Sequence, residues 1–463
     1  MIRYLDLVSD TVCAPITASG RAGVAVIRVS GSRAKEIIQN ITDIDKPLKS
    51  HRAYVSKIVR NGDPIDEVLV TYFKEGQSFT GDEVVEISSH GNPLLTNQII
   101  NLLLEHGCRS AEPGEFSFRA FYNGKIDLLQ AESINSLIHS KNTLKASVSL
   151  DQLRGGLSKS LGQVEQSLIA VMAELEASID FSEENLDTNE YSLLSQKIYQ
   201  SLEIVNNFIG SYDVSRNLDR GYQVLLLGPT NVGKSSLFNA LCNESLAIVT
   251  DVPGTTRDLL RGQVFVGPYN VEFLDSAGVR FSDDQIESIG IKLSLEKAKN
   301  ADAILCVLDV STGFDDAFVK DLPLEKTIFV LNKMDLLATE QERKKFVNRI
   351  YSEFPRVQPE DVVQISALKK MGLENLSQRL EACLSLRYSG EENFYILQAR
   401  HFNHLSQCRN HLNATLELIN KNESPDIISQ ELLLGLSEVH RILGKEYDDE
   451  ILDHIFSQFC IGK

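Results

Sequence analysis

The chain has 463 residues, 43% of them hydrophobic, and a formal net charge of −18. This length suits roughly three domains. No apolar run approaches the ~18 residues that cross a bilayer, so we expect a soluble protein with no membrane span. The acidic balance argues against a passive nucleic-acid binder, because such proteins normally present a basic face to the phosphates.

The seven cysteines are scattered, odd in number and never form a C-x-x-C pair. This pattern argues against a disulfide framework and a zinc site, and it is typical of a reducing compartment. Residues 1–10 show no basic segment followed by an apolar one, so export is not expected. The sequence therefore predicts a cytoplasmic protein.

Residues 1–125 predict a compact α+β domain, because short apolar runs rich in β-branched and aromatic residues recur there. The predicted elements are strands at 24–29, 68–73 and 84–87, a turn at 88–91 and a helix at 94–104. Arg28 and Glu86 are charged residues inside two of these strands. Spacing alone favours solvent-facing positions for both, at about two to one, because charged side chains are mostly exposed.

From residue 128 to about 217 the periodicity becomes helical. Apolar residues recur at steps of three and four from Leu150 to Ile179, which predicts one face of a long helix. An acidic run at 180–184 marks a break, and a second helix is expected at 193–208. Helical sequence resumes near residue 394 and continues to Phe459.

The stretch 228–235, GPTNVGKS, has the G-x-x-x-x-G-K-[ST] pattern of a phosphate-binding loop. It follows the apolar run 224–227 and precedes an expected helix start. Glycines let consecutive N–H groups point at phosphate oxygens, and the helix N-terminus adds partial positive charge. We expect nucleotide contacts from Asn231, Val232, Gly233, Lys234, Ser235 and Ser236. Lys234 would reach the β- and γ-phosphates, and the Ser235 hydroxyl would bind Mg²⁺.

A second motif predicts the choice of base. The run NKMD at 332–335 follows the predicted strand 327–331 and supplies Asn332, Lys333 and Asp335. A buried carboxylate at Asp335 would accept from two N–H groups of guanine, a donor pair that adenine lacks. Ser366 and Ala367 form a turn that would close over the base. The predicted nucleotide is therefore GTP.

Two further segments complete the predicted magnesium site. Asp275, after the strand 271–274, is placed for the Mg²⁺ shell, and the Gly278 amide for the γ-phosphate. Thr256, in a loop at 254–258, would complete the Mg²⁺ shell when the γ-phosphate is present. With the phosphate loop, these are the motifs of a GTPase in their usual order.

The simplest organisation has an N-terminal α+β domain at 1–125 and a discontinuous α-helical domain at 126–217 and 385–463. An α/β P-loop GTPase domain at 218–384 is inserted between the helical pieces. Such an insertion couples the nucleotide state to helices at both junctions.

These features together resemble the MnmE (TrmE) family of tRNA modification GTPases. The resemblance rests on GRAG at 20–23, RVSG at 28–31, GEFS at 114–117, the inserted GTPase and FCIGK at 459–463. It implies a homodimer joined through the N-terminal domains, which forms a heterotetramer with the flavoprotein MnmG. It also implies addition of an aminomethyl or carboxymethylaminomethyl group to carbon 5 of the wobble uridine of certain tRNAs. A local basic patch or the partner must then hold much of the tRNA.

The resemblance also implies a folate site. The one-carbon unit comes from a tetrahydrofolate, in its 5-formyl or 5,10-methylene form. Arg28, Glu86, Lys125 and Lys463 match the family's folate-contacting positions, and this reverses the interpretation of Arg28 and Glu86 from spacing. A carboxylate suits the N–H groups of the pterin, and basic side chains suit the glutamate tail.

For GTP hydrolysis, the residue after Gly278 is Val279, where many relatives carry a glutamine that orients water. The resemblance implies K⁺ beside the phosphates and a catalytic glutamate at Glu287. The implied K⁺ ligands are Asn231, Thr250, Val252 and Thr255, of which Thr250 and Thr255 also face the nucleotide. GTP and K⁺ would draw the two GTPase domains of a dimer together.

Cys460 is the second predicted catalytic residue. A nearby cation such as Lys463 would favour its thiolate, and its role as acid, nucleophile or contact is left open. Two alternatives are kept. One is a ribosome-assembly GTPase switch resembling the Era or Der groups, and the other is a folate-dependent one-carbon enzyme that GTP regulates.

Overall fold

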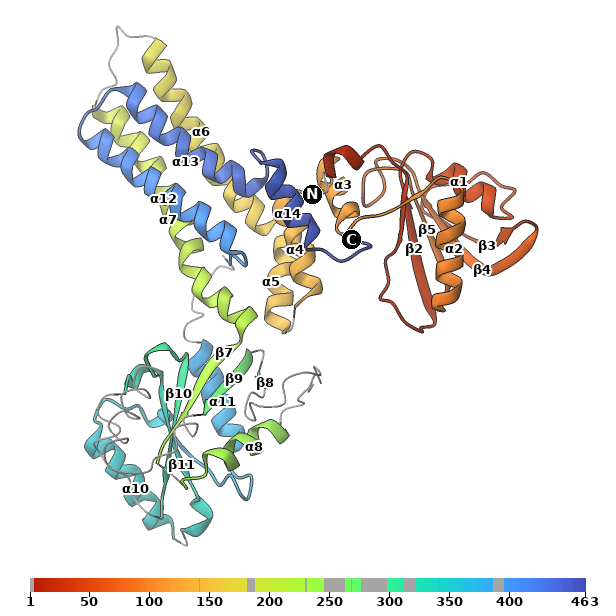
Figure 1. The fold of residues 1–463 in the computed structure, drawn as a ribbon. Helices are drawn as coiled ribbons and strands as arrows, with labels where there is room; N and C mark the ends of the chain where they lie inside the picture. Colours follow the sequence, from red (N-terminus) through yellow and green to blue (C-terminus); the bar gives the residue numbers. More distant parts are fainter. Residues whose placement is uncertain are drawn as a thin grey trace. The chain divides into compact units, whose positions relative to one another are not determined.

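The computed structural model describes residues 4–140, 142–180, 188–229, 231–244, 263–267, 269–275, 298–311, 322–337, 339–385 and 395–463. They form two compact units (Figure 1). Unit 1 comprises Met1–His139, Ser149–Ile209 and Gln398–Lys463, and unit 2 comprises Ser140–Val148 and Gly210–Leu397. This division does not separate residues 1–125 from the helical segments, so the predicted domain boundaries stay predictions.

Unit 1 contains a six-stranded sheet with the order β3-β4-β5-β2-β1-β6. The strands are β1 Val12–Pro15, β2 Val24–Ser30, β3 Arg52–Arg60, β4 Asp63–Phe73, β5 Val84–His90 and β6 Arg109–Ser110. Helices α1 (Ala34–Ile41) and α2 (Pro93–Glu105) share one apolar core with the sheet. The α+β prediction for this region is confirmed, because alternate strand residues such as Ile27 and Ile87 are fully buried there.

The predicted turn at 88–91 is wrong, because β5 continues to His90. Ser88 and Ser89 pair with Val26 and Ala25 of β2. Ser89 is buried, and its hydroxyl donates to the Ala25 carbonyl at 3.3 Å. Small polar residues resemble a turn in sequence, but here cross-strand hydrogen bonds satisfy them.

The helical segments are confirmed, with different helix bounds, and α5 and α7 are each divided between the two units. The helices are α3 Glu115–Tyr122, α4 Leu128–Ile138, α5 Thr143–Leu153, α6 Gly156–Asp180, α7 Thr188–Arg220, α12 Ala399–Asn420, α13 Pro425–Leu443 and α14 Asp449–Ser457. A single helix across 150–179 is wrong, because the chain breaks between α5 and α6 at Gly155, whose φ is +88°. The second helix is longer than the predicted 193–208.

A buried ion pair joins α4 to the first turn of α12. Arg400 donates to both carboxylate oxygens of Glu132, at 3.0 and 2.9 Å, and His401 lies 2.6 Å from the same group. Burial alone would raise the pKa of Glu132, but His401 and Arg400 outweigh it and lower the pKa to about 2. Gln398 adds a 3.3 Å contact to Ser136. The start of α12 is therefore fixed to α4 by charge as well as packing.

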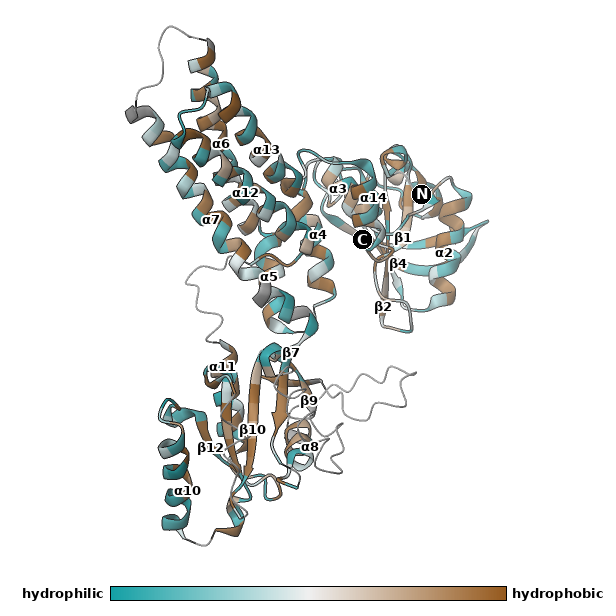
Figure 2. Cartoon of the chain, turned by 60° about the vertical axis from the view of Figure 1, so that its left-hand side comes forward, coloured by the Kyte–Doolittle hydropathy of each residue, from teal (hydrophilic) through white to brown (hydrophobic). Residues whose placement is uncertain are grey.

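Unit 2 is an α/β fold with a six-stranded sheet of order β12-β11-β10-β7-β9-β8. Its strands are β7 Tyr222–Leu227, β8 Gln263–Val266, β9 Tyr269–Asp275, β10 Ala303–Asp309, β11 Thr327–Asn332 and β12 Val362–Gln364, of which β8 is antiparallel to β9. Its longer helices include α8 (Lys234–Glu244), α10 (Glu340–Glu353) and α11 (Leu373–Ser385). Figure 2 shows β7 and β10 as hydrophobic and α10 as largely hydrophilic. This is the pattern of central parallel strands covered by helices.

The C-terminal segment packs on the start of α3 within unit 1. The Gly114 N–H donates to the Cys460 carbonyl at 3.4 Å, and the Phe116 N–H donates to the Lys463 carbonyl at 3.1 Å. Gly462 packs on β1, where an added Cβ would lie 2.2 Å from the Pro15 carbonyl oxygen. Residues 459–463 are therefore held by backbone contacts, and we call them the C-terminal tail.

Among the described helices, none is long and apolar enough to cross a membrane.

We predict that Gly114→Ala destabilises unit 1 by about 2–4 kcal/mol, from left-handed strain and overpacking together. Gly114 has a φ of +72°, and an added Cβ would lie 2.4 Å from the Phe456 carbonyl oxygen. Urea denaturation of the full chain, followed by far-UV circular dichroism, measures the loss.

The matched control is Gly124→Ala. Gly124 has a φ of +66° but no heavy atom within 4 Å of an added Cβ. This variant should lose only about 1 kcal/mol from backbone strain. Equal losses in the two variants would show that the contact with Phe456 contributes nothing.

Candidate functional site

The phosphate-loop sequence lies between β7 and α8 in unit 2. Gly228 and Gly233 both have positive φ, +153° and +99°. An added Cβ would lie 2.3 Å from the Val307 carbonyl oxygen at Gly228, and 2.3 Å from the Asn332 amide nitrogen at Gly233. Only glycine fits at either position. The loop leads into the N-terminus of α8 at Lys234, and the N-terminal end of a helix favours an anion.

The side chains of the loop lie partly at the surface. The Lys234 ammonium donates to the carbonyls of Gly228 and Pro229, at 2.8 and 2.7 Å. Asn231, Ser235 and Ser236 are exposed and Val232 is buried. The predicted nucleotide contacts from this loop thus lie close together in the chain and in space.

The NKMD segment braces the phosphate loop from β11. Asn332 is buried, and its amide nitrogen donates to the Val232 carbonyl at 2.8 Å. Its amide oxygen accepts from the Ala367 N–H at 3.0 Å. The Lys333 ammonium donates to the Asn231 carbonyl at 2.9 Å. The structure therefore brings together three predicted segments that are far apart in sequence.

Asp309 is a site residue that the sequence prediction missed. It ends β10, and its carboxylate pairs with the Lys333 ammonium at 2.6 Å. Burial tends to raise its pKa, but hydrogen bonds from Lys333 and Ser311 outweigh this and lower it. The available signal was a carboxylate directly after the apolar run 303–308.

The base-recognition residues are only partly as predicted. Ser366 and Ala367 are buried, and the Ser366 hydroxyl accepts from the Lys369 N–H at 3.1 Å. Asp335 is exposed, and the burial of its carboxylate against the guanine base stays a prediction. In the short 3-10 turn Met334–Leu336, Met334 takes the buried position instead.

Several predicted residues lie outside the described part of the chain. They are Thr250, Val252, Thr255, Thr256, Gly278 and Glu287. Asp275 is the last residue of β9, as predicted from the strand pattern.

A second constellation lies on the sheet of unit 1. Arg28 and Glu86 face each other in the β2–β5 register, and the guanidinium donates twice to one carboxylate oxygen, at 3.0 and 2.8 Å. Both lie on the sheet face away from the apolar core, as spacing predicted, but their side chains are only 14% and 25% exposed. The Arg28 guanidinium also lies 5.2 and 5.4 Å from the rings of Phe79 and Phe116.

Contacts link the other two predicted folate residues to this pair. The Lys463 carbonyl accepts from the Phe116 N–H, so the C-terminal tail meets the residue whose ring faces Arg28. The Lys125 ammonium donates to the Gly76 carbonyl at 3.0 Å, in the loop that carries Phe79. The four predicted residues therefore belong to one connected region of unit 1.

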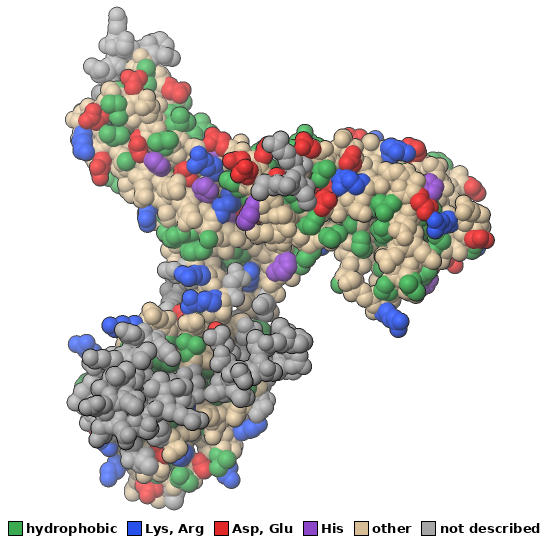
Figure 3. All heavy atoms as spheres, viewed as in Figure 1, with side chains coloured by type: hydrophobic (Ala, Val, Ile, Leu, Met, Phe, Trp, Pro, Cys, Tyr) green, Lys and Arg blue, Asp and Glu red, His purple; other side chains and the backbone are tan. Residues whose placement is uncertain are grey.

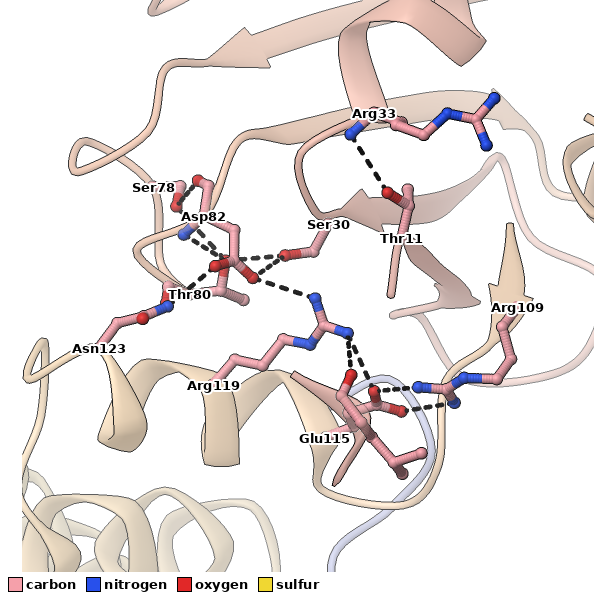
Figure 4. A network of polar contacts seen from close by, with 11 residues as sticks. Thr11, Ser30, Arg33, Ser78, Thr80, Asp82, Arg109, Glu115, Arg119 and Asn123 are labelled. Carbon is pink, nitrogen blue, oxygen red and sulfur yellow. Dashed lines mark hydrogen bonds and ion pairs between the residues drawn. The ribbon is translucent and has the colours of Figure 1, made fainter. Parts of the chain in front are cut away.

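A buried polar network beneath this region was not predicted (Figure 4). Arg119 and Glu115 are each 1% exposed and form an ion pair of 3.2 Å. Arg119 also donates to Asp82 at 3.2 Å, and Glu115 accepts from Arg109. Asp82 in turn accepts from the Ser30 hydroxyl at 3.2 Å. The network thus ties the start of α3 to the loop that precedes β5.

Cys460 is exposed, and its Sγ lies 3.9 Å from Nε2 of His139 at the end of α4. Figure 3 shows hydrophobic side chains gathered over the sheet of unit 1. By strand register Val24, Val55 and Leu69 lie on one face of the sheet, and they are 54%, 74% and 40% exposed. We call these three residues the open sheet face.

Comparison with known proteins matches nearly the whole chain. A model described as "GTP-binding protein TrmE N-terminus" matches residues 11–125, and one described as "MnmE helical domain" matches residues 128–460. The chain is 36% identical to a tRNA modification GTPase MnmE of Bdellovibrio bacteriovorus, over 99% of this chain and 98% of the relative. It is 36% identical to that of Natranaerobius thermophilus, over 99% and 100%.

Among solved structures, Era of Aquifex aeolicus is 25% identical over 41% of this chain and 66% of its own, with a TM-score of 0.28. A score this low carries no argument for the ribosome-assembly alternative. The relatives that match over full length are named for tRNA modification instead.

Proposed function

This chain belongs to the MnmE family of tRNA modification GTPases, and we propose that it adds an aminomethyl or carboxymethylaminomethyl group to carbon 5 of the wobble uridine. As a GTPase of this family, the chain binds GTP. In the proposed reaction it works with the flavoprotein MnmG and takes a one-carbon unit from a tetrahydrofolate.

The observation that carries the proposal is the Arg28–Glu86 pair with the C-terminal tail beside it. Glu86 supplies a partly buried carboxylate, an acceptor that suits the amino and ring N–H groups of a pterin. The rings of Phe79 and Phe116 add apolar surface. Lys125 and Lys463 would meet the carboxylates of the glutamate tail. The bound folate would supply the carbon, and the chain's residues would hold and orient it.

We expect Glu86→Gln to weaken binding of 5-formyltetrahydrofolate by about tenfold to a hundredfold, because a charged acceptor is replaced by a neutral amide. Titration calorimetry of the full chain measures this. The matched control is Glu67→Gln, an exposed glutamate on the neighbouring strand β4. Unchanged affinity in Glu86→Gln would remove Glu86 from the folate site.

The GTPase is proposed to use Mg²⁺ held by Ser235 and Thr256, with Asp275 nearby, and K⁺ beside the phosphates. Asn231 suits a K⁺ ligand because it is exposed while Lys333 anchors its carbonyl. Thr250, Val252 and Thr255 would complete that shell. Glu287 would act on the attacking water.

GTP turnover should then be much faster in KCl than in NaCl at equal ionic strength. Glu287→Ala should lose most turnover but retain GTP binding, whereas the exposed Glu374→Ala on α11 should change neither. Steady-state phosphate release measures GTP turnover in each salt, and stopped-flow mixing measures GTP binding. Equal rates in the two salts contradict the K⁺ proposal.

A homodimer is proposed through the open sheet face, since exposed valine and leucine on a sheet favour a covered surface. Sedimentation at micromolar concentration should give twice the chain mass of 51.6 kDa. Leu69→Asp should shift the protein to monomer, and Leu193→Asp, exposed on α7, should not. A monomeric wild-type chain would exclude this interface.

A further inference from the structure

His139 is placed to act on the thiol of Cys460. It is the residue that follows α4, and its Nδ1 lies 2.9 Å from the Asn135 carbonyl oxygen. A carbonyl oxygen only accepts, so Nδ1 carries the proton in the neutral ring. Nε2 is then an acceptor, and it faces the Cys460 Sγ at 3.9 Å.

Backbone contacts at Cys460 and in the three residues after it hold the segment that carries the sulfur. The Cys460 carbonyl accepts from Gly114, and the Lys463 carbonyl accepts from Phe116. Between them, Gly462 has a φ of +95° and lies against Pro15, where no side chain fits. The thiol is thus presented at a defined place by a held tail.

We propose that His139 is a positioning residue that accepts the thiol proton of Cys460 and so increases the share of reactive thiolate. The S–H bond breaks, an N–H bond forms at Nε2, and the electron pair stays on sulfur. The thiolate then lies beside an imidazolium. The use of this thiolate in one-carbon transfer rests on the proposed function.

The expected increase in thiolate follows from the distance between the two charges and from the high dielectric constant of water. Two unit charges about 4 Å apart in water favour the ion pair by about fivefold. Because free imidazole gains a proton below about pH 6.5 and free thiols lose one above about pH 8.5, the gain in thiolate is largest in mild acid.

Other charged groups lie on the elements around the pair. They are Lys463 in the tail, Glu112 and Glu115 at the start of α3, and His454 in α14. Glu115 is held by Arg109 and Arg119, and His454 lies 3.3 Å from the Gln458 amide. These groups exert the same electrostatic field in wild type and in a His139 variant. The difference between the two alkylation rates therefore reports the effect of His139 alone.

The test is the pH profile of Cys460 alkylation by iodoacetamide in full-length wild type and His139→Asn. The asparagine amide still donates to the Asn135 carbonyl but has no group that titrates. Mass spectrometry of the tryptic peptide 446–463, in which Cys460 is the only cysteine, gives the rate. Wild type should react about fourfold faster near pH 6, and the two should converge above about pH 9.

The matched control is His106→Asn. His106 follows α2 just as His139 follows α4, and its Nδ1 contacts the Leu102 carbonyl at 2.8 Å. It should leave the profile unchanged. The proposal is overturned if His139→Asn gives the wild-type profile, or if it slows alkylation equally at every pH, which would indicate access and not proton transfer.

This readout is independent of tRNA chemistry. If Cys460→Ser left wobble-uridine modification intact in cells, the proposed use of the thiol would fail. The alkylation profile would still decide whether His139 takes its proton.

Discussion

The buried pair between Arg119 and Glu115 is the interaction on which the candidate folate region depends. Both side chains are 1% exposed, and each has a further charged partner, Arg109 for Glu115 and Asp82 for Arg119. Buried charges are stable only when they are paired in this way, because an uncompensated one is strongly destabilising. Through Asp82 the network reaches the loop that carries Phe79, and through Glu115 it reaches the start of α3. The two rings beside Arg28 are therefore held by one set of charges.

The C-terminal tail packs against the same region. Helix α4 contacts or adjoins two of the points at which the chain passes from one unit to the other, after His139 and at Gln398. The chain leaves unit 1 after His139 and again after Ile209, and it returns at Ser149 and at Gln398. His139 contacts Cys460, while Gln398 and Arg400 contact α4. One short helix thus carries both the residue that meets the thiol and the anchor of the returning chain.

Local motifs were predictable, and contacts between distant residues were not. The phosphate loop, its flanking strand and helix, and the NKMD segment follow from residue type and spacing within a few positions. Asp309 and Arg119 escaped prediction because their partners lie 24 and 37 residues away in sequence. The Ser88–Ser89 pair resembled a turn because composition does not reveal cross-strand pairing. The pairing of Arg28 with Glu86 could be predicted only from the register of β2 and β5. The residue periodicity within either strand does not contain that register.

We propose that this chain modifies wobble uridine through the thiol of its C-terminal tail. Nucleoside mass spectrometry of bulk tRNA tests it most directly, in cells that lack the protein and carry either wild type or Cys460→Ser. The account predicts that the modified nucleoside disappears on deletion and returns only with wild type. A nucleoside profile that deletion leaves unchanged would contradict it.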